Sequence, residues 1–267
     1  MEYPKGFPAP VKLYLGDNAP SVFLLPIPLD EGEKFNDFYA SSCSAARRVQ
    51  AERYIKADDR IRCLAAGWLL DHSVRAVSGV GAIEEKDPRG KPTLGNLPEL
   101  NVSLAHAGKW VVSAIYDTAV GVDLEIEVDV SEGMAELFMS ESELRQYRLF
   151  RSDAKKRRYF FKIWTMKEAY LKAIGTGLVR SPNLISLDIQ DKTLTVEERT
   201  ETSDNTTALW HCHSSFISED SYYLSLCWKP ATVSSAVARR DYMEYKLLLN
   251  KTLPEIPNGS HAYKVAA

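Results

Sequence analysis

The chain has 267 residues, of which 45% are hydrophobic and 26% are charged, and its formal net charge is −3. These values are typical of a globular protein with one large core or two smaller ones, and the acidic balance argues against general nucleic-acid binding. There is no apolar run of about eighteen residues and no apolar segment directly after Met1, so we expect neither membrane insertion nor export, and a cytoplasmic location.

The first half of the chain predicts strands on either side of a helical region. Residues 45–77 favour one or two helices, because apolar side chains recur there with helical spacing. Turn-forming residues dominate 87–98. The expected buried stripe of the helical region consists of Ile61, Leu64, Ala65, Trp68 and Leu69. Strands are expected near residues 11–15, 22–26, 101–104 and 110–116.

The second half repeats this order of elements. Residues 120–128 predict a strand, because apolar residues alternate there with Gly121, Asp123, Glu125 and Glu127. The carboxylates of this strand therefore share one face. The elements expected after it are helices between about residues 132 and 174 and strands near residues 184–189, 194–199, 208–213 and 222–228.

Two segments of this half supply three carboxylates and a lysine. Glu168 and Lys172 lie four positions apart on the predicted helix before Gly175, so they share a face. Together with Asp123 and Glu125, Glu168 suits a hard cation such as Mg²⁺, which prefers carboxylate and phosphate oxygens, and a lysine beside it would neutralise the remaining phosphate charge. The segments thus indicate a metal-assisted reaction at a phosphate. For each segment alone, a solvated strand face or a surface Glu–Lys pair is the plain alternative.

Charge is also segregated along this part of the chain. Residues 110–144 contain no Lys or Arg, whereas residues 145–172 contain more basic than acidic residues. If the two stretches pack together, an acidic metal pocket lies beside a cationic phosphate clamp. The acids of the first stretch are Asp117, Asp123, Glu125, Glu127, Asp129, Glu132, Glu136, Glu141 and Glu143.

Four blocks of sequence resemble one known family. The first two are Gly-Val-Asp-x-Glu at 121–125 and Trp-x-x-Lys-Glu-Ala-x-x-Lys-x-x-Gly-x-Gly-Leu at 164–178. Gly90-Lys91-Pro92 and Ala105-His106-Ala107-Gly108 precede them in the same order. Together these blocks resemble the signature of the Sfp-like 4′-phosphopantetheinyl transferases, over roughly residues 40–190.

The resemblance implies transfer of the phosphopantetheine arm of coenzyme A to a serine of an apo acyl or peptidyl carrier protein, with release of adenosine 3′,5′-bisphosphate. It implies that Asp123, Glu125 and Glu168 hold Mg²⁺, with Mn²⁺ also possible, and that Lys172 contacts the phosphate next to the broken bond. Lys167 either assists or only ties the helix to the acidic strand. Glu168 or a metal-bound water is the candidate base.

The resemblance also implies contacts at the nucleotide end of coenzyme A. His106 matches the family histidine at the 3′-phosphate, and Lys91 matches a lysine that holds the nucleotide. Arg47 and Arg62 align with basic positions of the family's first helical region, for which a solvated helix face is the alternative.

The flanking Ala105 and Ala107 depart from the family pattern. The family often has serines at these positions, so hydroxyl contacts to the cofactor are absent here. Backbone groups or Ser103 are the expected replacements, and the departure concerns affinity more than reaction type.

The implied fold is α+β, with two similar halves in a pseudo-twofold arrangement and the active site at their interface. We expect the halves at residues 1–117 and 118–230, followed by a helix and a loosely attached tail at 231–267. A monomer is expected because the two halves already form the cleft. Neither nucleic acid nor membrane is expected as a partner.

Two other functional classes share part of this chemistry. A Mg²⁺-dependent pyrophosphohydrolase would use the same acids and lysines with a water nucleophile, but the motif spacing does not favour it. A module that binds coenzyme A or a carrier without catalysis would be expected to lose a metal acid, and this chain retains all three. Which carrier the enzyme serves is not predicted.

The basic run Lys155-Lys156-Arg157-Arg158 is either a solvated face or a docking surface for an acidic carrier protein. The four cysteines, which lack metal-type spacing, are expected to be reduced. His211 and His213 flank Cys212 without a second ligand cluster, which favours a structural role.

Overall fold

The computed structural model describes residues 6–29, 32–41, 43–177, 181–190, 193–198, 206–217 and 221–230. Leu178 at the end of the second motif and the predicted tail at 231–267 lie outside these ranges. None of the described helices is both long and apolar enough to cross a membrane.

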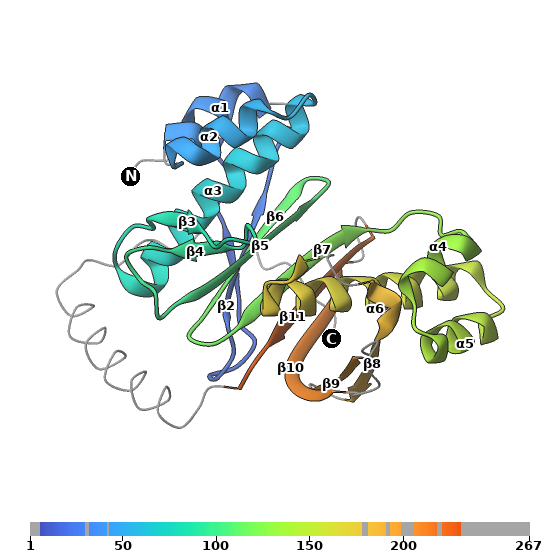
Figure 1. Cartoon of the computed structure of the whole chain (residues 1–267). Coiled ribbons are helices and arrows are strands. Elements are labelled where there is room, and N and C mark those ends of the chain that lie inside the picture. The colour runs from blue at the N-terminus through green and yellow to red at the C-terminus, as the bar shows by residue number, and fades with distance from the viewer. Residues whose placement is uncertain are drawn as a thin grey trace.

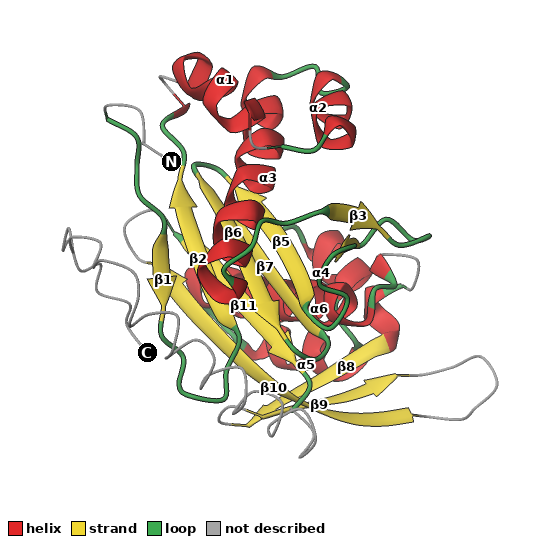
Figure 2. Cartoon of the chain, turned by 90° about the vertical axis from the view of Figure 1, so that its left-hand side faces the viewer, coloured by secondary structure: helices red, strands yellow, loops and turns green. Residues whose placement is uncertain are grey.

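The first half is a four-stranded antiparallel sheet with α3 on one face, and α1 and α2 pack on α3 (Figures 1 and 2). Its strand order is β1-β2-β6-β5, and a separate two-stranded hairpin, β3-β4, lies beside it. The strands are β1 (Val11–Leu13), β2 (Ser21–Pro26), β3 (Glu84–Lys86), β4 (Pro92–Leu94), β5 (Asn101–Ala107) and β6 (Trp110–Tyr116). The helices are α1 (Gly32–Ser41), α2 (Ala45–Glu52) and α3 (Ala57–Ser78).

The second half is a five-stranded antiparallel sheet with strand order β7-β11-β10-β9-β8. Helix α6 crosses this sheet, and α4 and α5 lie at its end (Figure 1). The strands are β7 (Val120–Ile126), β8 (Ile185–Gln190), β9 (Thr193–Glu198), β10 (Thr206–Ile217) and β11 (Tyr222–Trp228). The helices are α4 (Glu132–Phe138), α5 (Glu141–Leu149), α6 (Asp153–Ile174) and the short 3-10 turn η3 (Pro182–Leu184).

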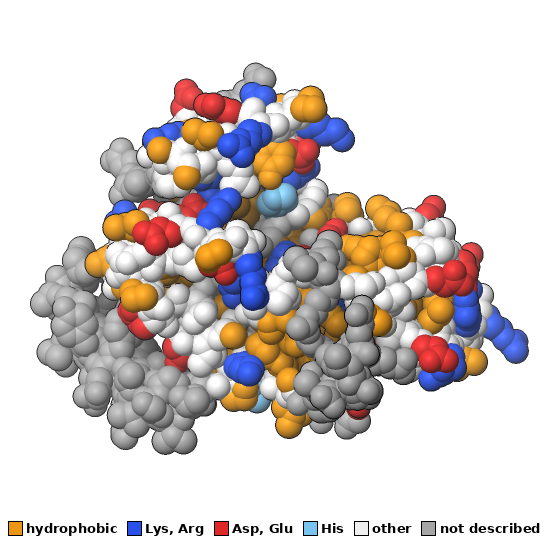
Figure 3. Space-filling model, viewed as in Figure 1, with side chains coloured by type: hydrophobic (Ala, Val, Ile, Leu, Met, Phe, Trp, Pro, Cys, Tyr) orange, Lys and Arg blue, Asp and Glu red, His pale blue; other side chains and the backbone are white. Residues whose placement is uncertain are grey.

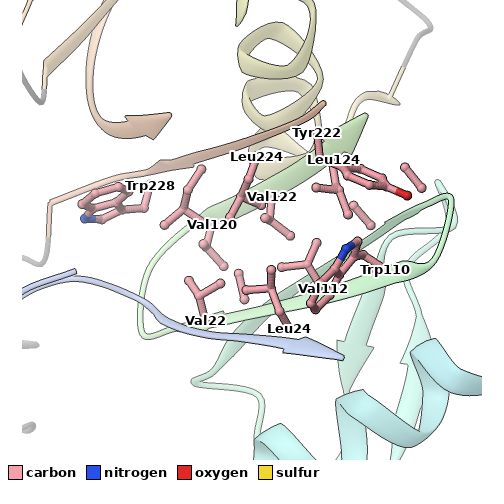
Figure 4. Packing of buried hydrophobic residues seen from close by; sticks show 14 of the residues in the cluster. Val22, Leu24, Trp110, Val112, Val120, Val122, Leu124, Tyr222, Leu224 and Trp228 are labelled. Carbon is pink, nitrogen blue, oxygen red and sulfur yellow. The ribbon is translucent and has the colours of Figure 1, made fainter. Parts of the chain in front are cut away.

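The two sheets pack face to face through a shared core (Figure 4). In β2, Val22 and Leu24 point into this core, whereas Phe23 and Leu25 point to the helices on the other side. A strand that is buried on both faces reads as a continuous apolar run, as Ser21–Pro26 does. In β7 only one face is apolar, so the opposite face is left for the acids.

The predicted α+β class is confirmed, and the two halves share a topology. In each half one strand is followed by helices and then by two antiparallel pairs of strands, and the last strand returns beside the first. The order β2-β6-β5 of the first sheet therefore corresponds to β7-β11-β10 of the second.

The sequence patterns missed α1 and the β3-β4 hairpin. Helix α1 is short, and its stability comes from packing Phe35 and Tyr39 against α3. The hairpin falls partly in the stretch predicted as turns. Its loop is held by Asp87, whose carboxylate accepts hydrogen bonds from the backbone N–H groups of Arg89 and Lys91.

Candidate active site

A cleft of about 380 Å³ opens between the two halves of the molecule. Its walls come from α2, α3, β5 and the β3-β4 hairpin on one side and from β7 and α6 on the other. Three predicted site residues do not line it: Arg62, Lys91 and Lys167. The predicted residues that the cleft brings together are Arg47, His106, Asp123, Glu125, Glu168 and Lys172.

The acidic wall forms because α6 lies directly on β7. Gly121 allows this approach, since a Cβ at that position would overlap the Ala169 carbonyl oxygen in the helix. Asp123 and Glu125 follow Gly121 on the same strand face, and Glu168 lies one position before Ala169. The close packing thus brings acids that are some forty residues apart in sequence into one cleft.

Asp123 and Lys172 form the central ion pair of this wall. Lys172 Nζ donates to Asp123 Oδ1 over 2.6 Å, and the Asp123 carboxylate is nearly buried, at 4% exposure. Asp123 Oδ2 is also buried and has no hydrogen-bond partner among the described residues. A buried carboxylate oxygen of this kind is costly unless a further donor or cation reaches it.

The two other acids, Glu125 and Glu168, have pKa values well above that of a free glutamate. Burial, followed by the charge of Asp123, raises the pKa of Glu125 from 4.5 to about 7, and Trp164 and Lys172 offset part of this shift. Burial and Asp123 likewise raise the pKa of Glu168 to about 7. Three carboxylates on this wall thus share one nearby ammonium, that of Lys172.

This donor set fits a hard divalent cation in its chemistry. Carboxylate oxygens are the ligands that Mg²⁺ prefers, and the crowding of Asp123, Glu125 and Glu168 is what a cation would relieve. The acids are not yet gathered around a common point: the described part of the chain contains no group of three His, Cys, Asp or Glu side chains placed to hold a metal.

His106 lies on the opposite wall. It follows Ala105 and precedes Ala107, both of which point into the core between the sheets, so the imidazole faces the cleft. The ring is solvent-accessible at its open side, but the cleft walls remove part of its water. This partial burial lowers the pKa of His106, and the positive charges of Lys172 and Arg62 lower it further.

Three predicted nucleotide contacts are already bonded to protein groups. Arg47 is buried and pairs with Glu84, although its side chain still reaches the cleft. Lys91 Nζ donates to the Ala173 carbonyl at the end of α6, over 2.8 Å. Arg62 pairs with Asp59 and also donates to the Gly108 carbonyl. Neither Arg47 nor Arg62 therefore lies on a solvated helix face, which was the alternative that the sequence left open.

Lys167 points away from the cleft, which corrects its prediction as a cofactor contact. The side chain is only 2% exposed. Its ammonium donates to Glu143 over 2.5 Å and to the carbonyls of Phe138 and Pro182. These three acceptors match its three N–H donors. Lys167 therefore ties α6 to α4, α5 and η3, not to the acidic strand.

Ser103 does not supply the hydroxyl that Ala105 and Ala107 lack. Its own hydroxyl is buried and accepts a hydrogen bond from the Val122 N–H across the two sheets. The residue therefore joins β5 to β7 rather than reaching into the cleft.

Most of the segregated charges form ion pairs away from the cleft. Arg148 pairs with Glu132 and Glu136, and Arg157 pairs with Glu127 and Asp129. Red and blue side chains accordingly lie together at the α4–α5 end in Figure 3. The segregated charges thus mainly form a network of surface ion pairs. The charged residues of this stretch that line the predicted pocket lie on β7 and α6.

Sequence reasoning missed two polar residues of the cleft, Gln50 and Lys86. Lys86 Nζ donates to Gln50 Oε1 over 2.7 Å, which joins the β3-β4 hairpin to α2. Lys86 lies just ahead of the Gly90-Lys91-Pro92 block, so recognising that block as part of a hairpin would have located it.

The four cysteines are free, as the sequence predicted, and all four are buried. His213 hydrogen-bonds to Ser215 on the same strand, and the described residues contain no metal cluster around it.

Comparison with known proteins matches residues 119–227 to the model of the 4′-phosphopantetheinyl transferase superfamily. The chain is 34% identical to the 4′-phosphopantetheinyl transferase HetI of Nostoc over 170 residues, which is 60% of this chain and 70% of that protein. It is 30% identical to the transferase Sfp of Bacillus subtilis over 159 residues, 57% of this chain and 67% of that protein.

The chain is also 33% identical to the transferase psf-1 of Bacillus pumilus, but that match spans only 51% of this chain and 59% of that protein. The chain belongs to the 4′-phosphopantetheinyl transferase superfamily. By class it is therefore an enzyme, and its similarity to Sfp confirms the family that the sequence motifs predicted.

Proposed function

We propose that the chain transfers the 4′-phosphopantetheine arm of coenzyme A to a serine of an apo acyl or peptidyl carrier protein, with the help of Mg²⁺ or Mn²⁺. The observation that carries this proposal is the cleft in which Asp123, Glu125, Glu168 and Lys172 face His106. Membership of the transferase superfamily supports the same reaction.

In this reaction the serine oxygen forms a bond to the phosphorus that carries the pantetheine arm. The bond from that phosphorus to the bridging oxygen of the pyrophosphate breaks, and adenosine 3′,5′-bisphosphate leaves with the bridging oxygen. The serine proton must pass to a base. Glu168 or a metal-bound water is the candidate base. Without metal, burial and the charge of Asp123 raise the pKa of Glu168 to about 7.

The other residues act on charge and position. Lys172 would donate to the phosphate next to the broken bond, where negative charge develops. Asp123, Glu125 and Glu168 would hold the divalent cation, which neutralises pyrophosphate charge when bound. His106 would contact the 3′-phosphate of coenzyme A, and Arg47 would support the nucleotide end from the same wall.

Both walls come from one chain, which supports a monomer as the active unit. We extend the proposal to a cytoplasmic enzyme whose carrier docks near the run 155–158. In that run Arg157 is already engaged with Glu127, and Arg158 lies over the Phe216 ring. Lys156 lies over the Tyr147 ring in the same way. Lys155 is therefore the charge of the run that we assign first to carrier docking.

The test is to mix the purified chain with coenzyme A, Mg²⁺ and an apo carrier protein, and to follow the carrier's intact mass. We expect the mass of one phosphopantetheine arm to be added, and Glu168→Gln to slow this transfer by about a thousandfold. Glu141→Gln, on an exposed face of α5, is the control and should leave the rate unchanged.

The carriers tested should include fatty-acid, polyketide and peptide-synthetase types. Cleavage of coenzyme A without any gain in carrier mass would instead indicate a pyrophosphohydrolase. Binding of coenzyme A without turnover would indicate a non-catalytic module. Either result would overturn the proposed transfer.

A further inference from the structure

The turn between β5 and β6 is bonded to three distant parts of the chain. It consists of Gly108 and Lys109. The Gly108 carbonyl accepts from Arg62 Nε over 2.7 Å, and the Lys109 N–H donates to the Tyr222 hydroxyl over 3.0 Å. The Lys109 carbonyl accepts from the Ile27 N–H over 2.6 Å. A two-residue turn needs none of these bonds to close, so they fix where the turn lies relative to the rest of the molecule.

Tyr222 holds this turn from the second half. It lies on β11, opposite Ile126 of β7, and its side chain is buried in the core between the sheets. Figure 4 shows Tyr222 reaching from β11 toward the end of β6 that carries Trp110. The approach is close: Gly108 has φ of 49°, and a Cβ there would overlap the Tyr222 hydroxyl.

Arg62 holds the same turn from the first half. All three of its nitrogens are engaged: Nε by the Gly108 carbonyl, and the other two by Asp59 over 2.7 Å and Asp58 over 3.7 Å. The side chain is mostly buried, at 15% exposure, and does not line the cleft. Its guanidinium is thus committed to the turn, which differs from the nucleotide contact that the sequence predicted.

His106 lies two residues before this turn, at the end of β5. Its ring faces the cleft that also contains Lys172 and Asp123. Since β5 belongs to the first half, and Asp123 on β7 and Lys172 on α6 belong to the second, the distance from His106 to the acidic wall depends on how the end of the β5-β6 hairpin sits between the halves. Tyr222 connects this hairpin end directly to the second sheet.

We propose that Tyr222 and Arg62 are positioning residues that clamp the Gly108–Lys109 turn from opposite sides and so set His106 for the 3′-phosphate of coenzyme A. This inference rests on the proposed function, because it takes coenzyme A as the ligand of the cleft. It adds Tyr222 to the site and assigns Arg62 to the support of His106 instead of to direct ligand contact.

The test compares the binding of coenzyme A with that of 3′-dephospho-coenzyme A, which lacks the phosphate assigned to His106. Titration calorimetry without a carrier gives both dissociation constants. Tyr222→Phe removes one hydrogen-bond acceptor, so we expect about tenfold weaker binding of coenzyme A. Binding of the dephospho form should change less than about twofold.

The same comparison in a His106→Ala background separates positioning from general damage. If Tyr222 acts through His106, Tyr222→Phe should have almost no further effect there. Arg62→Met should behave in the same way, and Arg62→Lys should recover part of the affinity because it retains a donor. An Arg62→Met effect that persists without His106 would show direct ligand contact and overturn the assignment.

Tyr223→Phe is the matched control. Tyr223 is the next residue on β11, and its hydroxyl donates to Glu127 over 3.2 Å, away from the turn. We expect unchanged binding of both ligands. Faster hydrogen exchange of the Lys109 amide in Tyr222→Phe, but not in Tyr223→Phe, would report the broken bond independently of any ligand.

The outcomes distinguish the two proposals. If the unaltered chain does not bind coenzyme A, the proposed function fails, and the clamp's role in ligand binding fails with it. If the chain binds coenzyme A but Tyr222→Phe weakens both ligands equally or neither, the positioning role alone is overturned.

Discussion

The two walls of the cleft differ in how their charges are satisfied. On the β7–α6 wall, Asp123, Glu125 and Glu168 share Lys172, and one Asp123 oxygen is left without a partner in the described structure. On the opposite wall, Arg47 is paired with Glu84, and nearby Arg62 and Lys91 are bonded to protein groups as well. The acidic wall therefore carries more carboxylates than cations, whereas the cations on and beside the opposite wall already have protein partners.

This contrast also separates two lysines of the same helix. Lys167 is buried and its donors are filled by protein acceptors. Lys172 is 31% exposed and faces the cleft. Both lysines belong to one sequence motif, and the motif does not show that one is buried and the other exposed. The difference arises because one face of α6 packs against α5 and the other against β7.

The largest expected effect on stability comes from Lys167→Met. The change leaves Glu143 buried, at 3% exposure, with an uncompensated charge. Breaking a buried pair in this way costs about 3–5 kcal/mol. Urea unfolding measures the free energy of unfolding. Lys172→Met leaves the Asp123 carboxylate unpaired, but Asp123 lines the open cleft, where water can reach it, so this change should cost less stability while slowing transfer more. The reverse ranking would contradict the division between scaffold and site.

The next largest effect is expected from Gly121→Ala. The added methyl group would overlap the Ala169 carbonyl oxygen and push α6 away from β7. Overpacking of this kind costs about 1–3 kcal/mol, and the displaced Glu168 should also slow transfer. Gly133→Ala is the control, because it lies in α4 with no atom within 4 Å of the added Cβ. It should leave unfolding unchanged or slightly stabilise the fold.

The acidic wall predicts a pH dependence of stability in the absence of divalent metal. Glu125 and Glu168 have pKa values raised from 4.5 to about 7, so the folded chain retains protons that the unfolded chain has released. The free energy of unfolding should therefore fall as the pH rises from about 4.5 to about 7, and level off above that. Urea unfolding across this range, with and without Mg²⁺, measures the fall, and added Mg²⁺ should reduce it.

A double variant, Glu125→Gln with Glu168→Gln, is the reference for this pH prediction. Its stability should exceed that of the unaltered chain above pH 7 and approach it near pH 4.5. The difference between the two proteins removes the contribution of His106, whose lowered pKa has the opposite sign. A constant difference at every pH would mean that the acids are not strained by burial and mutual repulsion.

Much of the architecture could be predicted from local pattern. The alternation of apolar residues predicted β7, and their helical spacing predicted α6. The cleft brings together four residues of the two motifs: Asp123, Glu125, Glu168 and Lys172. What could not be predicted depends on contacts between distant segments. The partner of Lys167 lies 24 residues away, and that of Lys109 lies 113 residues away. Neither pairing leaves a periodic trace in the sequence.

The smallest effect is expected from Arg148→Gln, which removes two ion pairs at once. Arg148 lies 2.6 Å from Glu132 and 2.6 Å from Glu136, the same separation as between Lys172 and Asp123. The three residues are about half exposed, so water and salt screen their attraction and the long side chains lose freedom on pairing. We expect the urea midpoint and the transfer rate to stay within measurement error. A loss of stability close to that of Lys167→Met would mean that distance, not burial, decides the strength of ion pairs in this protein.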